Sequence, residues 1–278
     1  MANVLPRQKQ VAVLNALVEG VSIRSTERML DVSRETVLSL LVRVGEGCAE
    51  LHDKMMRDLP CERIECDEIW GYVAKKQRNV TVNDPDEVGD TWTFVGIDAS
   101  TKLIPSYVVG KRDAPTTHAF VDDLASRMRN KIQIDTDGLA LYVDAIESAF
   151  GVSVDYARVV KSYEAEPTAP GRYSPARVAK TEKAAMIGEP DLRVASTSFV
   201  ERQNLTMRMG IRRMTRLTNA FSKKLRNHRA ATALHFAHYN LVRRHQTTRV
   251  TPAMACGVTD TMWSMEQLLD AALALEAA

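Results

Sequence analysis

The sequence predicts an α/β protein with a separate all-helical segment at its N-terminus. Residues 1–55 carry apolar side chains at helical spacing, whereas residues 62–160 alternate strand-like stretches with helix-like ones. Strands that alternate with helices favour a layered domain built around a sheet. A chain of 278 residues, 45% of them hydrophobic, corresponds to about two domains and can bury a sizeable core.

Composition excludes several classes of protein. Nearly balanced charge (net +2) and abundant apolar residues exclude disorder of the whole chain, and 13 Gly with 10 Pro exclude collagen-like and mucin-like chains. No stretch approaches the roughly 18 apolar residues of a membrane span, and residues 1–10 lack a signal-peptide pattern. The four cysteines form no CxxC pair, so we expect reduced thiols rather than a zinc ribbon or a disulfide framework. These observations predict a cytoplasmic protein without a membrane partner.

The N-terminal segment is expected to contain three helices. The first follows Pro6 and ends at Gly20, and Ser22 and Ser33 can cap the second and the third. Asp31 stands where the turn between the last two helices would usually carry glycine, and aspartate tolerates a left-handed backbone. Two short helices joined by a tight turn are typical of a helix-turn-helix.

In a helix-turn-helix, the second helix of the pair enters the DNA major groove with its first turns. Here that helix is expected over residues 34–44, and it would expose Arg34, Glu35 and Ser39. An arginine at this place can pair with a guanine edge or with a phosphate. A small helical bundle or a dimerisation module would show the same apolar spacing, so both alternatives remain open.

The rest of the chain is assigned from strand and helix patterns. Strands are expected at residues 62–74, 91–100, 102–110, 131–136 and 152–160. Helices are expected at residues 115–130 and 139–150, and from Phe199 to about His245. A polar hairpin loop is expected at 75–90, and residues 161–198 are predicted to form a polar, irregular insertion.

Positive charge is concentrated in one block. From Arg202 to Thr259 the chain has twelve Lys and Arg residues and no Asp or Glu, which leaves the remainder at −10. Such a block attracts a polyanion, whereas a solvated helix face usually mixes both signs. Arg208, Arg212 and Arg216 follow an i, i+4, i+8 spacing, which on a helix gives a stripe suited to a phosphate backbone.

Three carboxylates lie where strand or helix patterns end: Asp67, Asp137 and Glu201. Each has apolar or aromatic neighbours, and a buried carboxylate is costly unless it is paired or bound to metal. Three carboxylates brought together would repel one another, and hard divalent cations relieve that repulsion. Two Mg²⁺ ions on such a cluster can activate a nucleophilic oxygen and stabilise the leaving oxygen of a phosphodiester.

The motifs around these acids resemble those of a known family. The segments DEIWGY (67–72), TDGLALY (136–142) and FVERQNL (199–205) resemble, in this order, the three acidic motifs of the IS1 family of insertion-sequence transposases. VGIDAS, which contains Asp98, and YNLVRRH followed by TPA near the end resemble integrase-like cores more generally. The resemblance covers about residues 61–253.

The resemblance implies an RNase H-like mixed sheet flanked by helices, with Asp67, Asp137 and Glu201 as a DDE triad that binds two Mg²⁺ or Mn²⁺ ions. It also implies double-stranded DNA as partner, both element ends and target, and a homodimer or larger assembly that synapses two ends. A bacterial, nucleoid-associated location follows from the same resemblance. The cysteine-rich zinc motif often found at the start of such proteins is missing, so the helix-turn-helix would recognise the ends alone.

Residues near the triad are assigned separate roles. Strand alternation should send Glu68 to the face opposite Asp67, so only one of the two is expected to join the cluster, and Asp67 is preferred. Asp135 shares a face with Asp137 and is the alternative ligand or an outer-shell group, and Asp98 is expected to form structural hydrogen bonds. The candidate DNA contacts are Arg34, Ser39, Arg202, Asn204, Arg208, Arg212, Arg213, Arg216, Lys223 and Lys224.

The predicted domains are a helix-turn-helix (1–55), a catalytic domain (61–255) with the insertion at about 161–198, and a helical tail (256–278). The predicted function is a DNA transposase that cleaves element ends and joins the 3′-hydroxyl to target DNA by two-metal phosphoryl transfer. Two alternatives stay open. One is an RNase H-like metal-dependent nuclease without joining activity, and the other is a non-catalytic DNA-binding regulator.

Overall fold

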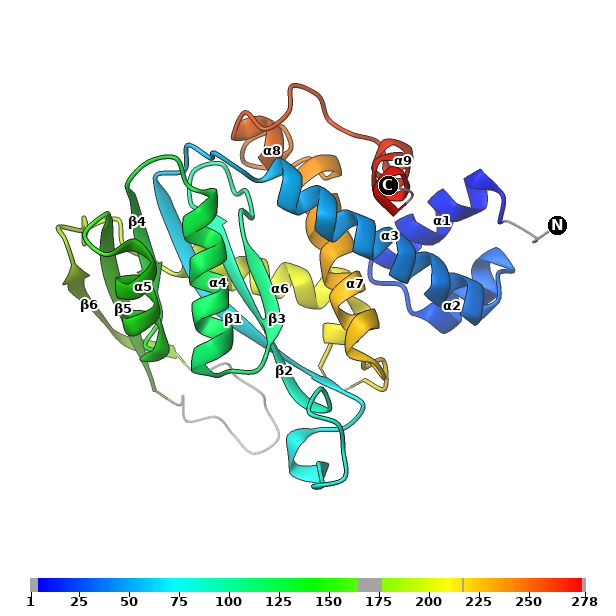
Figure 1. The fold of residues 1–278 in the computed structure, drawn as a ribbon, viewed down its shortest axis with the longest axis horizontal. Coiled ribbons are helices and arrows are strands. Elements are labelled where there is room, and N and C mark those ends of the chain that lie inside the picture. The colour runs from blue at the N-terminus through cyan, green and yellow to red at the C-terminus, as the bar shows by residue number, and fades with distance from the viewer. Residues whose placement is uncertain (1–4, 165–176, 217, 277–278) are drawn as a thin grey trace.

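A six-stranded mixed sheet forms the centre of the computed structural model, which describes residues 5–164, 177–216 and 218–276. The strands are β1 (Arg63–Val73), β2 (Gly89–Asp98), β3 (Tyr107–Gly110), β4 (Ile132–Thr136), β5 (Val154–Glu164) and β6 (Arg177–Ile187). Their order is β3-β2-β1-β4-β5-β6 (Figure 1). β1, β4 and β5 run parallel, and β2, β3 and β6 run antiparallel to their neighbours. The predicted α/β class, with a mixed sheet flanked by helices, is confirmed.

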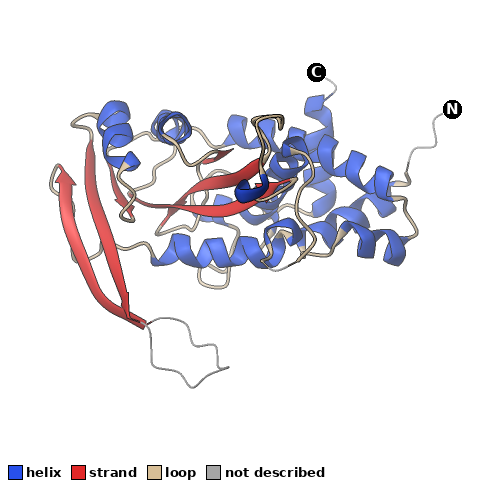
Figure 2. Cartoon of the chain, turned by 90° about the horizontal axis from the view of Figure 1, so that it is seen from below, coloured by secondary structure: helices blue, strands red, loops and turns tan. Residues whose placement is uncertain are grey.

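Helices cover both faces of this sheet (Figure 2). Helices α4 (Ala114–Arg127) and α5 (Leu141–Phe150) lie on one face, and α6 (Ser198–Gly210) lies on the other. Alternate residues of β1 point into the two cores, because successive side chains of a strand face opposite sides. Ile64 packs in the core under α4 and α5, and Ile69 packs with Val200 and Met207 of α6.

Three N-terminal helices precede the sheet: α1 (Arg7–Val18), α2 (Ile23–Leu30) and α3 (Arg34–Met55). The hydroxyls of Ser22 and Ser33 accept hydrogen bonds from the amides three residues on, and Asp31 is left-handed, with φ 51° and ψ 55°. The predicted caps and turn are therefore confirmed. The end predicted for the third helix, near Val44, is wrong, because buried residues such as Cys48 continue its apolar face to Met55.

Helix α3 packs against two helices from the other end of the chain, α7 (Leu225–Ala237) and α9 (Met265–Glu276) (Figure 1). Two glycines allow the close approach. A Cβ at Gly45 would lie 2.4 Å from the carbonyl oxygen of Ala230, and one at Gly47 would lie 2.1 Å from that of Ala272. A single hydrophobic cluster runs from these helices into the core under α4 and α5.

Two strand predictions need correction. Residues 102–106 form no strand, since Lys102 has a positive φ of 66° and Pro105 has no amide hydrogen to donate to a ladder. The segment 161–198 is not irregular throughout, because β5 extends to Glu164 and pairs with β6. The side chains of β6 are largely exposed, so it lacks the alternating pattern that identifies a half-buried strand. Residues 165–176 of this segment lie outside the described part of the chain.

The long helix expected from Phe199 to about His245 is interrupted. Helix α6 ends at Gly210, a 3₁₀ turn follows at Arg212–Met214, and α7 continues into a π-helical turn at His238–Val242. Gly210 is a weak helix former, and a Cβ there would lie 3.0 Å from the ring of His235. The i, i+4, i+8 stripe of arginines is therefore wrong, since only Arg208 of the three lies on α6.

The remaining elements are short. A 3₁₀ turn (Gln77–Asn79) lies in the hairpin loop between β1 and β2, and α8 (Pro252–Ala255) precedes α9. Within the described ranges, no helix is both long and apolar enough to span a bilayer.

Candidate active site

Asp67 lies on β1, just past the point where β4 stops pairing with that strand. The last pair of the β1–β4 ladder joins Cys66 to Thr136. Asp67 and Glu68 therefore have a neighbouring strand only on the β2 side, and Asp137 follows directly after the end of β4. The end of the β1–β4 ladder thus brings acids that are distant in the sequence to one place.

The structure groups Asp67, Glu68 and Asp137. Each offers a carboxylate oxygen, and these three oxygens lie within 4.8 Å of one another. The prediction that only one of Asp67 and Glu68 can join the cluster is wrong. Their side chains do leave opposite faces of β1, but Asp137 stands beyond the edge of the ladder, where a group from either face can reach it.

Glu68 is held by residues that sequence reasoning did not single out. Arg112 donates to its Oε1 from Nε (2.7 Å) and pairs with it through Nη2 (2.5 Å), and the hydroxyl of Tyr142 on α5 donates to Oε2 (3.3 Å). The side chain of Glu68 is 1% exposed. Its position next to Asp67 could have indicated that Glu68 belongs to the cluster, but strand alternation favoured Asp67 alone.

Asn204 connects α6 to the acidic cluster. Its Nδ2 donates a hydrogen bond of 2.8 Å to Oδ2 of Asp67, and the amide of Glu68 donates to Oδ1 of Asp67. The buried Oδ1 of Asn204 has no hydrogen-bond partner among the described residues. An acceptor oxygen without a donor, next to three carboxylates, suits a cation.

Glu201 lies on the first turn of α6 but is not one of the three clustered acids. Its Oε1 accepts hydrogen bonds from Nζ of Lys161 on β5 (2.5 Å) and from the hydroxyl of Thr197 (2.8 Å). Its side chain is 44% exposed. The carboxylate is nevertheless close enough to act electrostatically on Asp67.

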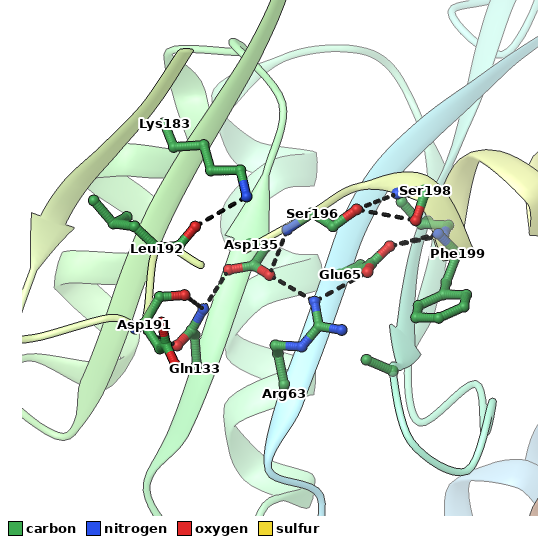
Figure 3. A network of polar contacts seen from close by, with 12 residues as sticks. Arg63, Glu65, Gln133, Asp135, Lys183, Asp191, Leu192, Ser196, Ser198 and Phe199 are labelled. Atoms are coloured by element: carbon green, nitrogen blue, oxygen red, sulfur yellow. Dashed lines mark hydrogen bonds and ion pairs between the residues drawn. The ribbon is translucent and has the colours of Figure 1, made fainter. Parts of the chain in front are cut away.

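A buried polar network fixes the start of α6 relative to the sheet (Figure 3). Glu65 of β1 accepts hydrogen bonds from the amides of Phe199 (2.7 Å) and Val200 (3.2 Å) in the first turn of α6. Arg63 joins Glu65 (3.1 Å) to Asp135 of β4 (2.9 Å). The network therefore positions the helix that carries Glu201 and Asn204.

Asp135 and Asp98 are engaged away from the cluster. Besides Arg63, Asp135 accepts hydrogen bonds from the amide of Ser196 and from Gln133 (Figure 3). Asp98 accepts from the amide and hydroxyl of Thr101, which closes the turn after β2. The structural hydrogen bonding expected of Asp98 is confirmed.

Burial and mutual repulsion control the ionisation of the cluster. Burial first, and then the charge of Glu68, raise the pKa of Asp67 to about 7, and the charges of Asp137 and Glu201 add to the shift. The pKa of Glu68 is also raised, by burial first and by Asp137 next, against the opposing effect of Arg112. Without a cation, the cluster therefore resists holding all its negative charges.

A large basic cleft lies at the other end of α6. It measures about 1120 Å³ and separates α2 and α3 from residues 210–227. Its basic lining residues are Arg24, Arg34, Arg43, Arg212, Arg213, Lys223, Lys224 and Arg226. Glu35 is its single acidic residue among the described ones. Six of the ten candidate DNA contacts line this cleft: Arg34, Ser39, Arg212, Arg213, Lys223 and Lys224.

The other four candidate contacts lie elsewhere. Asn204 contacts Asp67, as described above, and Arg202 lines a smaller pocket beside α6. Arg208 donates to the carbonyl oxygen of Met214, and Arg216 is exposed beyond the 3₁₀ turn.

No protein-family model matches the chain, and no curated protein matches its sequence. Among solved structures, similarity was found to a piggyBac transposase synaptic complex with hairpin DNA, at 12% identity and a TM-score of 0.42, covering 97% of this chain and 70% of that one. The Mos1 strand transfer complex matches at 17% identity and a TM-score of 0.22, covering 53% of this chain and 57% of that one. A Mos1 mariner paired-end complex with Mn matches at 14% identity and a TM-score of 0.21, with 53% and 59% covered. This chain thus spans less than two thirds of the Mos1 chains.

Proposed function

We propose that this chain is a DNA transposase that uses divalent cations to cleave and join phosphodiesters. One observation carries the proposal: three carboxylates converge beside Asn204 of α6, and a cleft lined by eight basic residues opens at the C-terminal end of the same helix. At 1.5 Å per residue, Asn204 and Gly210 are about 9 Å apart along the helix, or about three nucleotide steps of a DNA strand. A single nucleic acid can therefore contact both features.

The acidic residues present suit hard divalent cations. Asp67, Glu68 and Asp137 would hold Mg²⁺ or Mn²⁺, since all their ligand atoms are carboxylate oxygens. The unpartnered Oδ1 of Asn204 and the raised pKa of Asp67 both point to a missing positive charge. Two ions bound here, the number the resemblance implies, would stabilise the attacking and leaving oxygens of a phosphodiester.

The residues of the chain contribute position and charge. Asp67, Glu68 and Asp137 form a rigid cluster, because β1, the end of β4 and the Arg112 contact fix them. Glu201 pairs with Lys161, and it would join the ligand set if substrate drew that lysine to a phosphate. Asn204 keeps Asp67 oriented. Such positioning and electrostatic stabilisation are the usual terms of phosphoryl transfer.

The proposed reaction has two stages. Water attacks the phosphorus at an element end, the bond to the 3′ oxygen breaks, and a free 3′-hydroxyl is left. That hydroxyl then attacks a phosphodiester of target DNA in line, without a covalent protein intermediate. The target's own bond between phosphorus and the 3′ oxygen breaks as the new bond forms, and a target strand with a 3′-hydroxyl leaves. The helix-turn-helix at 1–55 would bind the ends, and two chains or more would hold two ends together.

The test is cleavage of the DNA repeats that flank the gene, with Mg²⁺, by the wild type and by Asp137→Asn. The variant should lose cleavage and keep its affinity for DNA, because the basic cleft is untouched. An active Asp137→Asn would remove this residue from the site. A second assay offers a pre-cut end with a free 3′-hydroxyl. Hydrolysis without joining would indicate a nuclease, and inactivity of the wild type in both assays would favour a DNA-binding regulator.

A further inference from the structure

A second, smaller pocket lies beside α6 and is lined by residues from distant parts of the chain. It measures about 260 Å³. Lys102 follows β2, Arg202 and Gln203 belong to α6, and Arg243, Arg244 and His245 follow the π-helical turn. Asn204 marks the side of α6 that contacts the acidic cluster, and on a helix Arg202 and Gln203 are turned from it by roughly 160° and 100°. The pocket and the acidic cluster therefore flank α6 on different sides.

The basic residues of this pocket lack ion-pair partners in the described part of the chain. None of its described lining residues is acidic, and none of Lys102, Arg202, Arg243 and Arg244 forms an ion pair within the described part of the chain. A concave surface with charges of one sign concentrates the opposite ion.

Lys102 is the most unusual member of the set. It is 7% exposed, and its Nζ donates to the carbonyl oxygen of Ala99 and lies 3.4 Å from the centre of the Phe199 ring. Asp98 and Glu65 act on it electrostatically but form no ion pair with it. Thr101 occupies only Oδ2 of Asp98, whose Oδ1 has no partner among the described residues, and the α6 amides occupy Glu65. A buried lysine without a carboxylate partner is costly.

Gln203 provides an independent observation. The residue is 3% exposed and lines the pocket, yet its Nε2 has no hydrogen-bond acceptor among the described residues. A buried amide donor without an acceptor is rare and requires an explanation. An anionic oxygen next to this amide would supply the missing acceptor.

The donors of the last segment are partly fixed in advance. Nε of Arg244 donates to the carbonyl oxygen of Arg249 (2.6 Å), which leaves its two terminal nitrogens free. Nδ1 of His245 accepts from the amide of Thr247 (3.3 Å), so the neutral ring carries its proton on Nε2 and can donate. Arginine forks of this kind suit the oxygens of a phosphate.

We propose that this pocket is a phosphate-binding site, which receives one phosphoryl group on Arg243, Arg244, Lys102 and the amide of Gln203. A volume of about 260 Å³ accommodates a phosphate with part of its ester but is small for a drug-sized ligand. The phosphate belongs either to a DNA strand, at its end or within its backbone, or to a free phosphate compound. This site goes beyond the proposed transposase activity, because it needs neither the acidic cluster nor a divalent ion.

The test measures binding of inorganic phosphate to the full chain by calorimetry, in EDTA and at constant ionic strength. Arg243→Ala should weaken binding by about tenfold or more, since it removes a charge-assisted hydrogen bond. Gln203→Leu should also weaken binding, without lowering the free energy of unfolding, because it replaces an unsatisfied donor by an apolar group of similar size. If the Gln203 amide only supported the fold, Gln203→Leu would lower the free energy of unfolding and leave phosphate binding unchanged.

The matched control is Arg78→Ala, which removes the same charge from the exposed hairpin loop. It should bind phosphate like the wild type, and so should Asp137→Asn, whose cleavage defect concerns the other site.

Competition by 5′-phosphorylated and unphosphorylated oligonucleotides identifies the source of the phosphate. Displacement by the phosphorylated form alone indicates a strand end, equal displacement indicates the backbone, and no displacement indicates a free phosphate compound. A wild type that binds no phosphate, or variants Arg243→Ala and Gln203→Leu that bind as well as the wild type, would overturn the proposal.

Discussion

Asn204 donates from Nδ2 to Oδ2 of Asp67 across 2.8 Å, and this bond joins α6 to β1 at the acidic cluster. A carboxyl that accepts such a bond is oriented before any ligand arrives. A second contact between α6 and β1 is formed by Glu65, which accepts hydrogen bonds from the amides of Phe199 and Val200. The two contacts lie about one helical turn apart, so the register of α6 against β1 determines where Glu201 stands.

The first prediction concerns pH. The pKa of Asp67 is raised from 3.8 to about 7 in the folded protein, so the protonated form is favoured there. In EDTA, the contribution of this group to stability is complete below about pH 4 and is lost as the pH rises through about 7. Asp67→Asn cannot ionise, so the melting temperature of the wild type should fall relative to that of the variant as pH rises from 5 to 8.

The exposed Asp122 provides the control, and Asp122→Asn should follow the wild-type curve. Mg²⁺ should stabilise the wild type more at pH 8 than at pH 6, since the cation binds the ionised carboxylates. Parallel pH curves for the wild type and Asp67→Asn would contradict this account.

The second prediction concerns Glu68. If its carboxylate holds a cation, Glu68→Gln should reduce cleavage more than about 100-fold while DNA binding is unchanged. Arg112→Ala should lower the affinity for Mn²⁺ by about 10- to 100-fold, because Arg112 orients Glu68. Its effect on cleavage should be smaller than that of Glu68→Gln. Metal affinity is measured by titration of Mn²⁺.

Glu62→Gln serves as the control for Glu68, since Glu62 is exposed just before β1. Full activity of Glu68→Gln would show that Glu68 only pairs with Arg112. The metal ligands would then be the triad predicted from the sequence, Asp67, Asp137 and Glu201.

The third prediction concerns the ion pair between Lys161 and Glu201. Lys161→Met removes the cation beside Glu201 and leaves the carboxylate free to turn toward Asp67. Mn²⁺ affinity of the protein alone should rise a few-fold, because the local charge becomes more negative. Lys131→Met, which breaks the Lys131–Asp155 pair on the same sheet, should leave it unchanged. Equal effects of the two variants would exclude a role for Glu201 in the cluster.

Local signals in the sequence predicted local structure well. Ser22, Ser33 and Asp31 specify caps and a turn through their own side chains and backbone preferences, without help from the rest of the fold. The mixed α/β class followed from alternating strand and helix patterns for the same reason. The length of α3 did not, because its continuation depends on packing against α7 and α9.

The candidate active site could not be predicted fully from the sequence, because it depends on contacts between distant elements. Alternation along β1 correctly placed Asp67 and Glu68 on opposite faces, yet the sequence does not reveal that β4 stops pairing at Thr136 and leaves room for Asp137 between them. The partners of Glu68 and Glu201 come from distant elements and carry no motif. Helix α6 ends at Gly210, where a Cβ would lie 3.0 Å from the distant His235, and the spacing of the arginines does not reveal this end.

The fourth prediction concerns the glycines of α3. Alanine is a better helix former than glycine, so Gly47→Ala would be stabilising by about 1 kcal/mol on a free helix face. Here the new Cβ would lie 2.1 Å from the carbonyl oxygen of Ala272 on α9, and we expect a loss of about 1–3 kcal/mol. Ala49→Gly, on the exposed side of the same helix, should cost about 1 kcal/mol through propensity alone. Urea denaturation measures both, and a stabilised Gly47→Ala would mean that α9 does not pack against α3 as described.

The last prediction separates two neighbouring arginines of the basic cleft. Arg212 is exposed, and Arg212→Ala should weaken DNA binding and reduce the log–log salt slope by about one unit. Arg213 donates to the hydroxyl of Ser222 (3.2 Å) and to the carbonyl oxygen of Asn227 (2.8 Å), and burial lowers its pKa to about 10. Arg213→Ala should therefore lower the free energy of unfolding by about 1–3 kcal/mol, because it leaves a carbonyl without its donor.

The two variants remove the same charge from adjacent residues of one 3₁₀ turn, so each is the control for the other. Arg212→Ala should unfold at the same urea concentration as the wild type, and Arg213→Ala should show the smaller change in salt slope. The two arginines differ in their contacts. The guanidinium of Arg213 donates hydrogen bonds within the protein, whereas the exposed guanidinium of Arg212 can bind the phosphates of a ligand. An unchanged slope for Arg212→Ala would show that DNA does not follow this wall of the cleft.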